Sequence, residues 1–175
     1  MRRFYAAIKG LAAVGLIATT SAAGAGCDGD TRASATEKGS MPKGPVEIVA
    51  APDEDDTAEV VRRELVRAKG DGKRLLVYVG ATWCEPCERF HEAAKAGKLD
   101  ATFPGLRLLE FDLDRDQDRL KRAGYRSKMI PLFAIPREDG TGSGEQIEGG
   151  LKGDKAVSNL TGRLRQLLAT GRGEP

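Results

Sequence analysis

The sequence predicts an α/β domain with a central mixed sheet flanked by helices, placed after an N-terminal signal and a flexible tether. Helical and strand-like patterns alternate between residues 53 and 171, and a glycine-rich hairpin lies near the end of this range. Alternating strands and helices favour parallel pairing, whereas a hairpin pairs its strands antiparallel. A hydrophobic content of 40% is enough for a core, and residues 172–175 are expected to be a disordered tail.

Residues 1–26 are typical of a secretion signal. Basic residues up to Lys9 are followed by the apolar segment 10–20, and small residues then lead to Cys27. The apolar segment is shorter than the about 20 residues that a membrane-spanning helix needs. We therefore expect an extracytoplasmic protein of the bacterial periplasm or cell envelope.

Cys27 allows two interpretations. The run Ala25-Gly26-Cys27 resembles a bacterial lipoprotein signal, which implies lipidation of Cys27, although Gly24 stands where such signals usually have Leu. Alternatively, Ala23-Gly24-Ala25 is an A-x-A cleavage site and the mature protein is soluble in the periplasm or secreted. We favour the lipid anchor, because an unpaired cysteine is a liability in an exported protein. Segment 27–52, rich in small residues and proline, is then expected to be the tether.

The charge balance argues against a nucleic-acid partner. Lys and Arg total 28 and Asp and Glu total 26, which gives a net charge of +2. Without the three basic residues of the signal, the net charge of the remaining chain is −1. The remaining chain has no sustained basic stripe.

The elements of the domain follow from apolar spacing and from stop signals. The first helix is expected to begin after the acidic residues 53–56 and to end near Gly70, with Val61, Leu65 and Ala68 on its apolar face. Strands are expected at 75–79, 106–113, 132–135 and 146–148, and helices at 86–96 and 114–123 and from Asp154 onward. The predicted order is therefore α β α β α β β α.

The segment Trp83-Cys84-Glu85-Pro86-Cys87 lies where a predicted strand meets a predicted helix. Two cysteines at this spacing are the layout of reversible dithiol–disulfide chemistry. Unpaired N–H groups and the positive dipole end of the helix favour a thiolate at Cys84. We expect an exposed Cys84 as the nucleophile, and Cys87 as the group that resolves the mixed disulfide.

This motif, together with Ile130-Pro131, resembles the thioredoxin superfamily over residues 56 to 170. The resemblance implies a thioredoxin-like fold and a cis peptide bond at Pro131. It also implies a substrate groove that includes Ile130 and Gly149, and supporting roles for Trp83, Glu85 and Pro86. The same five-residue motif occurs in exported thioredoxin-like proteins that reduce apocytochrome c for haem attachment.

Two positions depart from the family's pattern. Tyr78 stands six residues before Cys84, where thioredoxins carry a buried Asp that assists proton transfer, and Glu110 aligns with the Lys that accompanies it. The proton of Cys87 must then go to water, Glu110 or the Tyr78 hydroxyl, and the residues do not choose among them.

The combined prediction is an extracytoplasmic thiol–disulfide oxidoreductase, more a reductant than a strong oxidant. A helix terminus contributes about 0.3–1 kcal/mol to a nearby anion, and Glu85 opposes it through like charge. We expect a potential nearer about −270 mV than about −120 mV.

The expected partners are exported proteins that carry disulfides or dithiols, and a membrane thiol reductant that reduces the Cys84–Cys87 disulfide again. The protein itself is expected to be a monomer. No flavin or nicotinamide motif is present, so the Cys84–Cys87 disulfide is the expected redox group, with no other cofactor and no resident metal.

Three other interpretations of the cysteines remain open. The chain can be a thioredoxin-fold binding module that holds partners without turnover. Cys84, Cys87 and His91, the single histidine, can in principle bind zinc or copper, although no fourth ligand is evident. A purely structural disulfide is the third, but so short a loop gains little unfolded-state entropy.

Overall fold

The computed structural model describes residues 42–54 and 56–170. The strands are β1 (Glu47–Ala50), β2 (Arg74–Gly80), β3 (Leu106–Asp112), β4 (Leu132–Pro136) and β5 (Gly142–Glu148). The helices are α1 (Thr57–Gly70), α2 (Glu85–Lys95), α3 (Leu113–Arg122) and α4 (Ala156–Thr170), with a 3-10 turn, η1 (Gly153–Lys155), before α4. The predicted signal, Cys27, the tether up to residue 41 and the tail lie outside the described residues.

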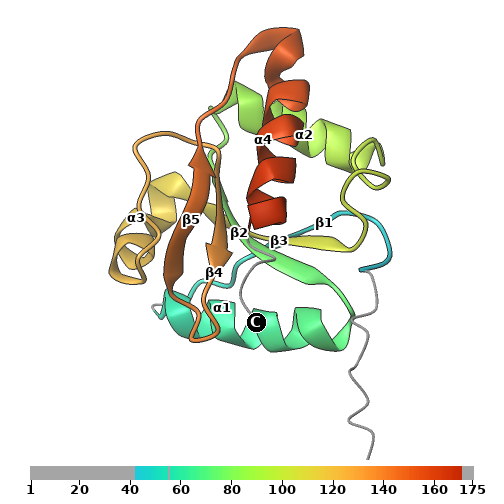
Figure 1. The fold of residues 1–175 in the computed structure, drawn as a ribbon. Coiled ribbons are helices and arrows are strands. Elements are labelled where there is room, and N and C mark those ends of the chain that lie inside the picture. The colour runs from blue at the N-terminus through green and yellow to red at the C-terminus, as the bar shows by residue number, and fades with distance from the viewer. Residues whose placement is uncertain (1–41, 55, 171–175) are drawn as a thin grey trace, which may run out of the picture. The chain divides into compact units, whose positions relative to one another are not determined.

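The five strands form one mixed sheet in the order β1-β3-β2-β4-β5 (Figure 1). β1 and β2 both pair parallel with β3, whereas β4 pairs antiparallel with β2 and with β5. The expected parallel beginning and antiparallel hairpin edge are thus confirmed. Short connections and helical crossovers account for this division, because parallel neighbours need a crossover and hairpin strands do not.

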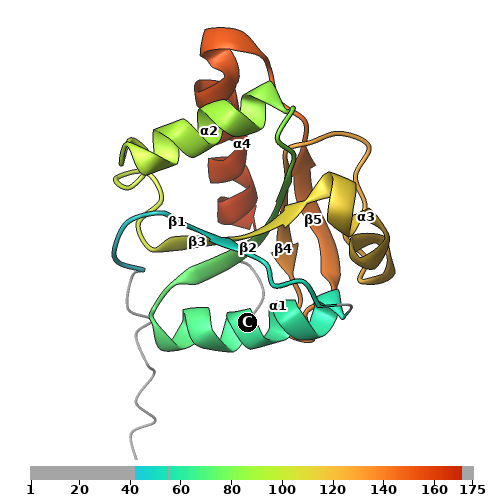
Figure 2. The same cartoon turned by 180° about the vertical axis from the view of Figure 1, so that it is seen from behind.

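Helices cover both faces of the sheet, α1 and α3 on one side and α2 and α4 on the other (Figures 1 and 2). Side chains that point to opposite faces of a strand therefore enter two cores. On β3, Leu106 and Leu108 join the α2/α4 core, and Leu109 and Phe111 join the α1/α3 core. The centre of the sheet is buried on both faces, which explains the continuous apolar run from Leu75 to Val79 in β2.

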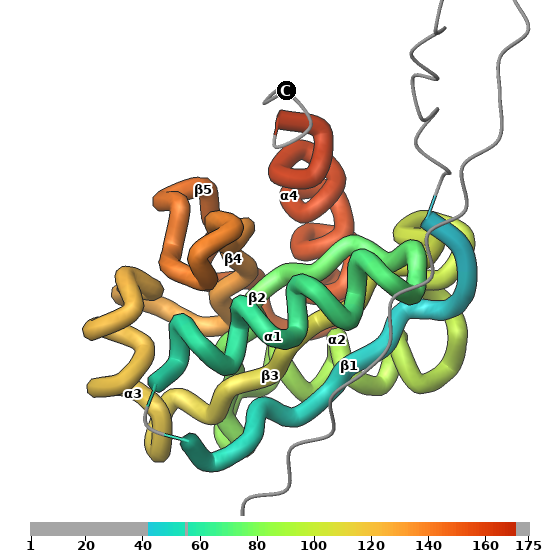
Figure 3. Tube along the Cα trace, turned by 90° about the horizontal axis from the view of Figure 1, so that it is seen from below, coloured from blue at the N-terminus to red at the C-terminus, as the bar shows by residue number. Residues whose placement is uncertain are grey.

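β1 corrects one prediction, because it lies within segment 27–52, where a tether was expected. Glu47 to Ala50 pair in register with Arg107 to Glu110 of β3, at the sheet edge visible in Figure 3. Outside the ladder, the Val46 N–H donates to Asp100 Oδ1 at 2.8 Å. Four residues at a sheet edge show too little alternation for a strand to be recognised, so partners distant in sequence decide its conformation.

Local capping sets where the helices begin. Asp56 accepts a hydrogen bond from the Glu59 N–H at the start of α1, and Asp112 accepts two from the first turn of α3. Asp154, expected to cap the last helix, lies instead within η1, and α4 begins two residues later. Among residues 42–54 and 56–170, no helix combines the length and the apolar character needed to cross a bilayer.

Candidate active site

Cys84 and Cys87 form a disulfide at the start of α2. Strand β2 ends at Gly80, and the three residues after it lead to Cys84, which is the N-cap residue of the helix. Its sulfur accepts a hydrogen bond from the Cys87 N–H at 3.3 Å. The predicted junction of strand, motif and helix is thus present, with Cys84 Sγ at the end of the helix where N–H groups lack partners.

The expected exposure of Cys84 is wrong for this disulfide form. Cys84 is 4% exposed and Cys87 is 3% exposed, and both belong to the core under α2 and α4. The neighbouring Trp83 is 64% exposed. The reason is tertiary packing, since both cysteines are packed among the apolar side chains of the α2/α4 core.

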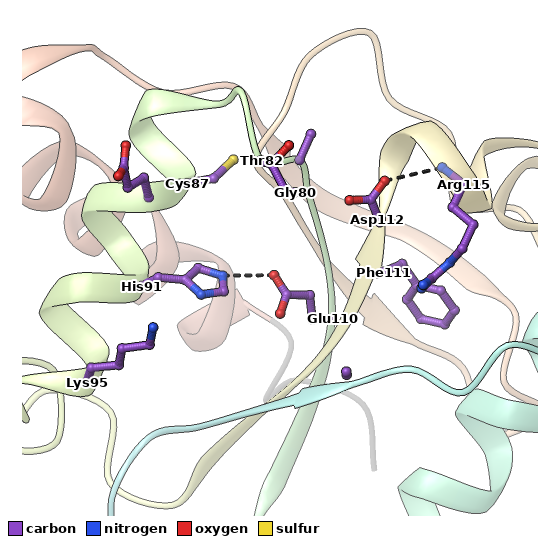
Figure 4. A pocket seen from close by; sticks show the side chains of 12 residues that line it. Gly80, Thr82, Cys87, His91, Lys95, Glu110, Phe111, Asp112 and Arg115 are labelled. Atoms are coloured by element: carbon purple, nitrogen blue, oxygen red, sulfur yellow. Dashed lines mark hydrogen bonds and ion pairs between the residues drawn. The ribbon is translucent and has the colours of Figure 1, made fainter.

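A cavity of about 470 Å³ lies between α2 and the ends of β2 and β3 (Figure 4). Cys87, Glu88, His91 and Lys95 line it from α2. Glu110, Phe111 and Asp112 line it from β3, and Arg115 from α3. Within it, His91 Nε2 lies 2.8 Å from Glu110 Oε1, and Figure 4 shows the two side chains meeting across the cavity. A titratable pair therefore shares one cavity with a cysteine of the disulfide.

Tyr78 is completely buried next to this pair, with its ring centroid 5.5 Å from that of His91. Its position in β2 is in register with Glu110 of β3, so the two residues aligned from the sequence are neighbours. Burial, and secondarily the charge of Glu110, raise the pKa of Tyr78 far above its usual range. The hydroxyl has no hydrogen-bond partner among the described residues. A Cβ at Gly80 would lie 3.0 Å from this oxygen, which explains a glycine at the end of β2.

Glu85 and Pro86 occupy the first turn of α2. Glu85 accepts from Arg89 Nε at 2.9 Å and from the Gly153 N–H at 3.0 Å. The Arg89 hydrogen bond, followed by the one from Gly153, holds the pKa of Glu85 below its usual value. Pro86 fits the first turn because no intrahelical partner awaits its missing N–H. The negative charge next to Cys84 is therefore partly offset by Arg89.

A second hollow, of about 350 Å³, lies beside Trp83. Ile130 and Gly149, the predicted groove residues, line it together with Trp83 and the exposed Met129. The Ile130–Pro131 peptide bond is cis, as the resemblance implied, and the Gly149 N–H donates to the Pro131 carbonyl at 2.9 Å.

Close packing explains the glycine at position 149. Its φ of +68° favours glycine, and a Cβ there would lie 3.2 Å from Met129 Cβ.

The indole of Trp83 is held by a 2.8 Å hydrogen bond from Nε1 to Asp114 Oδ2. The tertiary structure thus brings Trp83, Ile130 and Gly149 together around one hollow.

These features occur together in a mixed sheet of order β1-β3-β2-β4-β5, with the disulfide at the start of α2 and a cis-proline just before β4. The fold is thioredoxin-like. No protein-family model and no curated protein matches this chain.

Several thioredoxins are among the solved structures to which this chain is similar. A poplar thioredoxin h is 21% identical, with 75% of this chain and 100% of that chain covered and a TM-score of 0.43. Thioredoxin O1 from Arabidopsis thaliana, in its oxidized state, is 16% identical over 73% of this chain and 97% of its own, with a TM-score of 0.44. A Nicotiana alata thioredoxin is 17% identical over 75% and 97%, with a TM-score of 0.45. The assignment of the fold rests on the topology above.

Several residues of the site were not found from the sequence. His91 was considered as a metal ligand and not as the partner of Glu110, and neither Asp114 nor Arg89 was identified. The i, i+4 spacing of Glu85 and Arg89 was a usable signal. The contacts of His91 with Glu110 and of Trp83 with Asp114 join segments distant in sequence, so no local pattern indicates them. No group of three or more His, Cys, Asp or Glu side chains within 42–54 and 56–170 is placed to hold a metal ion.

Proposed function

We propose that the protein is an extracytoplasmic thiol–disulfide oxidoreductase that exchanges electrons with other exported proteins. The observation that carries the proposal is the Cys84–Cys87 disulfide at the N-terminus of α2 in a thioredoxin-like fold. A purely structural disulfide would stabilise the fold little here, because closing so short a loop removes little entropy from the unfolded chain.

The reaction begins from the reduced form. The Cys84 thiolate attacks one sulfur of a partner disulfide, which forms a mixed disulfide and expels the partner's other sulfur as a thiolate. Cys87 then loses its proton and attacks Cys84 Sγ, which releases the second partner thiolate and closes the Cys84–Cys87 bond. The partner gains two electrons and two protons, and the pair of cysteines loses them.

Electrostatics at Cys84 favours a reductant over a strong oxidant. The unpaired N–H groups of α2 stabilise the thiolate by about 0.3–1 kcal/mol, and the charge of Glu85 works in the opposite direction. Arg89 offsets part of that charge. We therefore place the potential nearer about −270 mV than about −120 mV.

Docking is assigned to the hollow beside Trp83. Trp83 and Met129 are 64% and 58% exposed, and large exposed apolar side chains of this kind are typical of surfaces that bind other proteins. In this proposal Ile130, Pro131 and Gly149 shape the groove, and Trp83 covers the disulfide.

The cellular setting is also proposed. Lipid on Cys27 would keep the domain at the membrane surface as a monomer, and a membrane dithiol donor would reduce the disulfide after each cycle. Apocytochrome c is one client class, because the motif from Trp83 to Cys87 is shared with its exported reductases.

Insulin reduction tests the enzyme against the binding module. Wild type should precipitate insulin chains in the presence of dithiothreitol, and Cys84→Ala should lose this activity. Equal activity of the two proteins would contradict catalysis by Cys84.

Equilibration with glutathione measures the reduction potential of the Cys84–Cys87 pair, and a value above about −170 mV would contradict the reductant assignment. Partners trapped by Cys87→Ala would identify the clients.

A further inference from the structure

The proposed reaction requires that Cys87 lose a proton, because the thiolate is the attacking species. Cys87 is 3% exposed and lies in an apolar core, where a thiolate is disfavoured. A proton acceptor must therefore lie nearby. We propose that Glu110 is this acceptor and that His91 holds Glu110 in position for the transfer; the inference rests on the proposed function.

Three carboxylates line the cavity that contains Cys87: Glu88, Glu110 and Asp112. Asp112 already accepts hydrogen bonds from the Asp114 and Arg115 N–H groups at 2.9 and 3.2 Å, as the cap of α3. Glu88 lies on the exposed side of α2. Glu110 is half-buried, and Figure 4 shows its carboxylate directed into the cavity toward α2. Its placement makes it the carboxylate best suited to take a proton from within the core.

The Tyr78 hydroxyl is excluded as the acceptor. It is buried next to Glu110, and both burial and that charge oppose ionisation of the phenol. A phenol that stays protonated has no capacity to accept a proton from a thiol at neutral pH.

His91 lies one helical turn after Cys87, so both side chains are on the same face of α2. Its Nε2 lies 2.8 Å from Glu110 Oε1, and its ring contacts Tyr78 at a centroid distance of 5.5 Å. These contacts fix the ring and, through it, the carboxylate. His91 is thus a positioning residue that acts through Glu110. Other titratable or charged groups around the cavity are Tyr78 from β2, Glu88 and Lys95 from α2, Asp112 from β3 and Arg115 from α3.

The step balances without another reactant. The S–H bond of Cys87 breaks, its electron pair stays on sulfur, and the proton passes through cavity water to Glu110. Cys87 Sγ then bonds to Cys84 Sγ, and the bond from Cys84 to the partner sulfur breaks. Glu110 returns the proton to solvent, and the departing thiolate takes one up.

Single-turnover reaction with dithiobis(nitrobenzoate) tests the assignment. With reduced protein in excess, attack by Cys84 releases one thionitrobenzoate, and attack by Cys87 on the resulting mixed disulfide releases the second. Cys87→Ala should show the first release without the second, which identifies the two phases. Glu110→Gln should leave the first phase unchanged and slow the second at least about tenfold at neutral pH. The deficit should shrink as the pH rises, because hydroxide then removes the Cys87 proton without the carboxylate.

Glu88→Gln is the matched control, since it removes the same charge from the same cavity, and its second phase should stay within twofold of wild type. A second phase in Glu110→Gln within twofold of wild type would overturn the inference and leave the proposed function standing. A first phase no faster than that of a free thiol would contradict the proposed function itself. Slowing by Tyr78→Phe equal to that of Glu110→Gln would also overturn the assignment of the base.

His91 is tested by a pair of variants. His91→Gln keeps an N–H donor for Glu110 and should stay within about threefold of wild type, whereas His91→Leu should slow the second phase about fivefold or more. Equal rates in the two variants would refute the positioning role. Urea midpoints of all variants show whether they fold, and this pair keeps the inference testable if Glu110→Gln does not fold.

Discussion

Arg107 and Glu110 lie three residues apart on β3 and carry opposite charges on opposite faces of the sheet. Arg107 is surrounded by carboxylates of β1, of α1 and of the residue after α1, with nitrogen–oxygen distances of 2.9 Å to Glu47, 3.2 Å to Glu64 and 2.8 Å to Asp71. Glu110 meets the imidazole of His91 at 2.8 Å and borders a cavity.

The difference separates a structural charge from one suited to chemistry. A nearly buried cation is tolerated when several anions compensate its lost hydration, and such a set holds segments together with no group left to react. Glu110 has a partner that is itself titratable, and the open cavity gives it access to Cys87. The number and kind of partners, more than burial, distinguish the two sites.

The largest expected effect is on stability, at Arg107. Arg107→Met leaves the buried Glu64 and its neighbours without their central cation, and should lower the free energy of unfolding by about 3 kcal/mol. Urea denaturation measures this change. Arg62→Met is the control, because Arg62 pairs with Glu59 on the exposed side of α1 and should cost less than about 0.5 kcal/mol. A loss below about 1 kcal/mol for Arg107→Met would show that the cluster is not structural.

A smaller effect is expected in the acid range, at Glu47. Its hydrogen bond from Lys73, and more weakly those from Arg107, hold the pKa of Glu47 below its usual value. A lowered pKa stabilises the fold above the unfolded value of about 4.3, and this stability is lost as the pH falls through the folded pKa. Glu47→Gln should therefore cost about 1 kcal/mol at pH 7 and show a shallower loss of stability between about pH 5 and pH 3. Urea midpoints across this range test it, and parallel curves for the two proteins would contradict it.

Tyr78→Phe should change stability little and in the favourable direction. The hydroxyl is buried without a partner, so its removal should leave the free energy of unfolding unchanged or raise it by up to about 1 kcal/mol. Both thionitrobenzoate phases should keep their rates. A stability loss above about 1 kcal/mol, measured in urea, would mean that the hydroxyl serves the fold.

The smallest effect is expected at Glu85, whose charge Arg89 already offsets. Glu85→Gln should speed the attack of Cys84 on dithiobis(nitrobenzoate) by less than about threefold, since a like charge beside the thiolate is removed. Arg89→Gln, which leaves Glu85 uncompensated, should slow the same phase by a similar factor. An unchanged or faster first phase in Arg89→Gln would show that Arg89 does not screen Glu85 from the thiolate.

Much of the fold was predictable because its signals are local. The runs that became β2 and β3, the apolar face of α4 and the position of Cys84 before α2 follow from apolar spacing and capping. β1 was missed because its four residues depend on pairing with β3. The exposure of Cys84 was mispredicted because helix-end chemistry says nothing of how closely α2 packs against α4.

The sequence by itself determined the order and type of most elements and the presence of a cysteine pair at a helix start, since these depend on neighbours a few residues away. Only the tertiary structure decided that His91 of α2 meets Glu110 of β3, that Trp83 meets Asp114, and that Arg107 collects three carboxylates. Each of these contacts joins segments that are far apart in the sequence and are brought together when the two cores pack. Helical and strand periodicity reports only on neighbouring residues and therefore cannot predict such contacts.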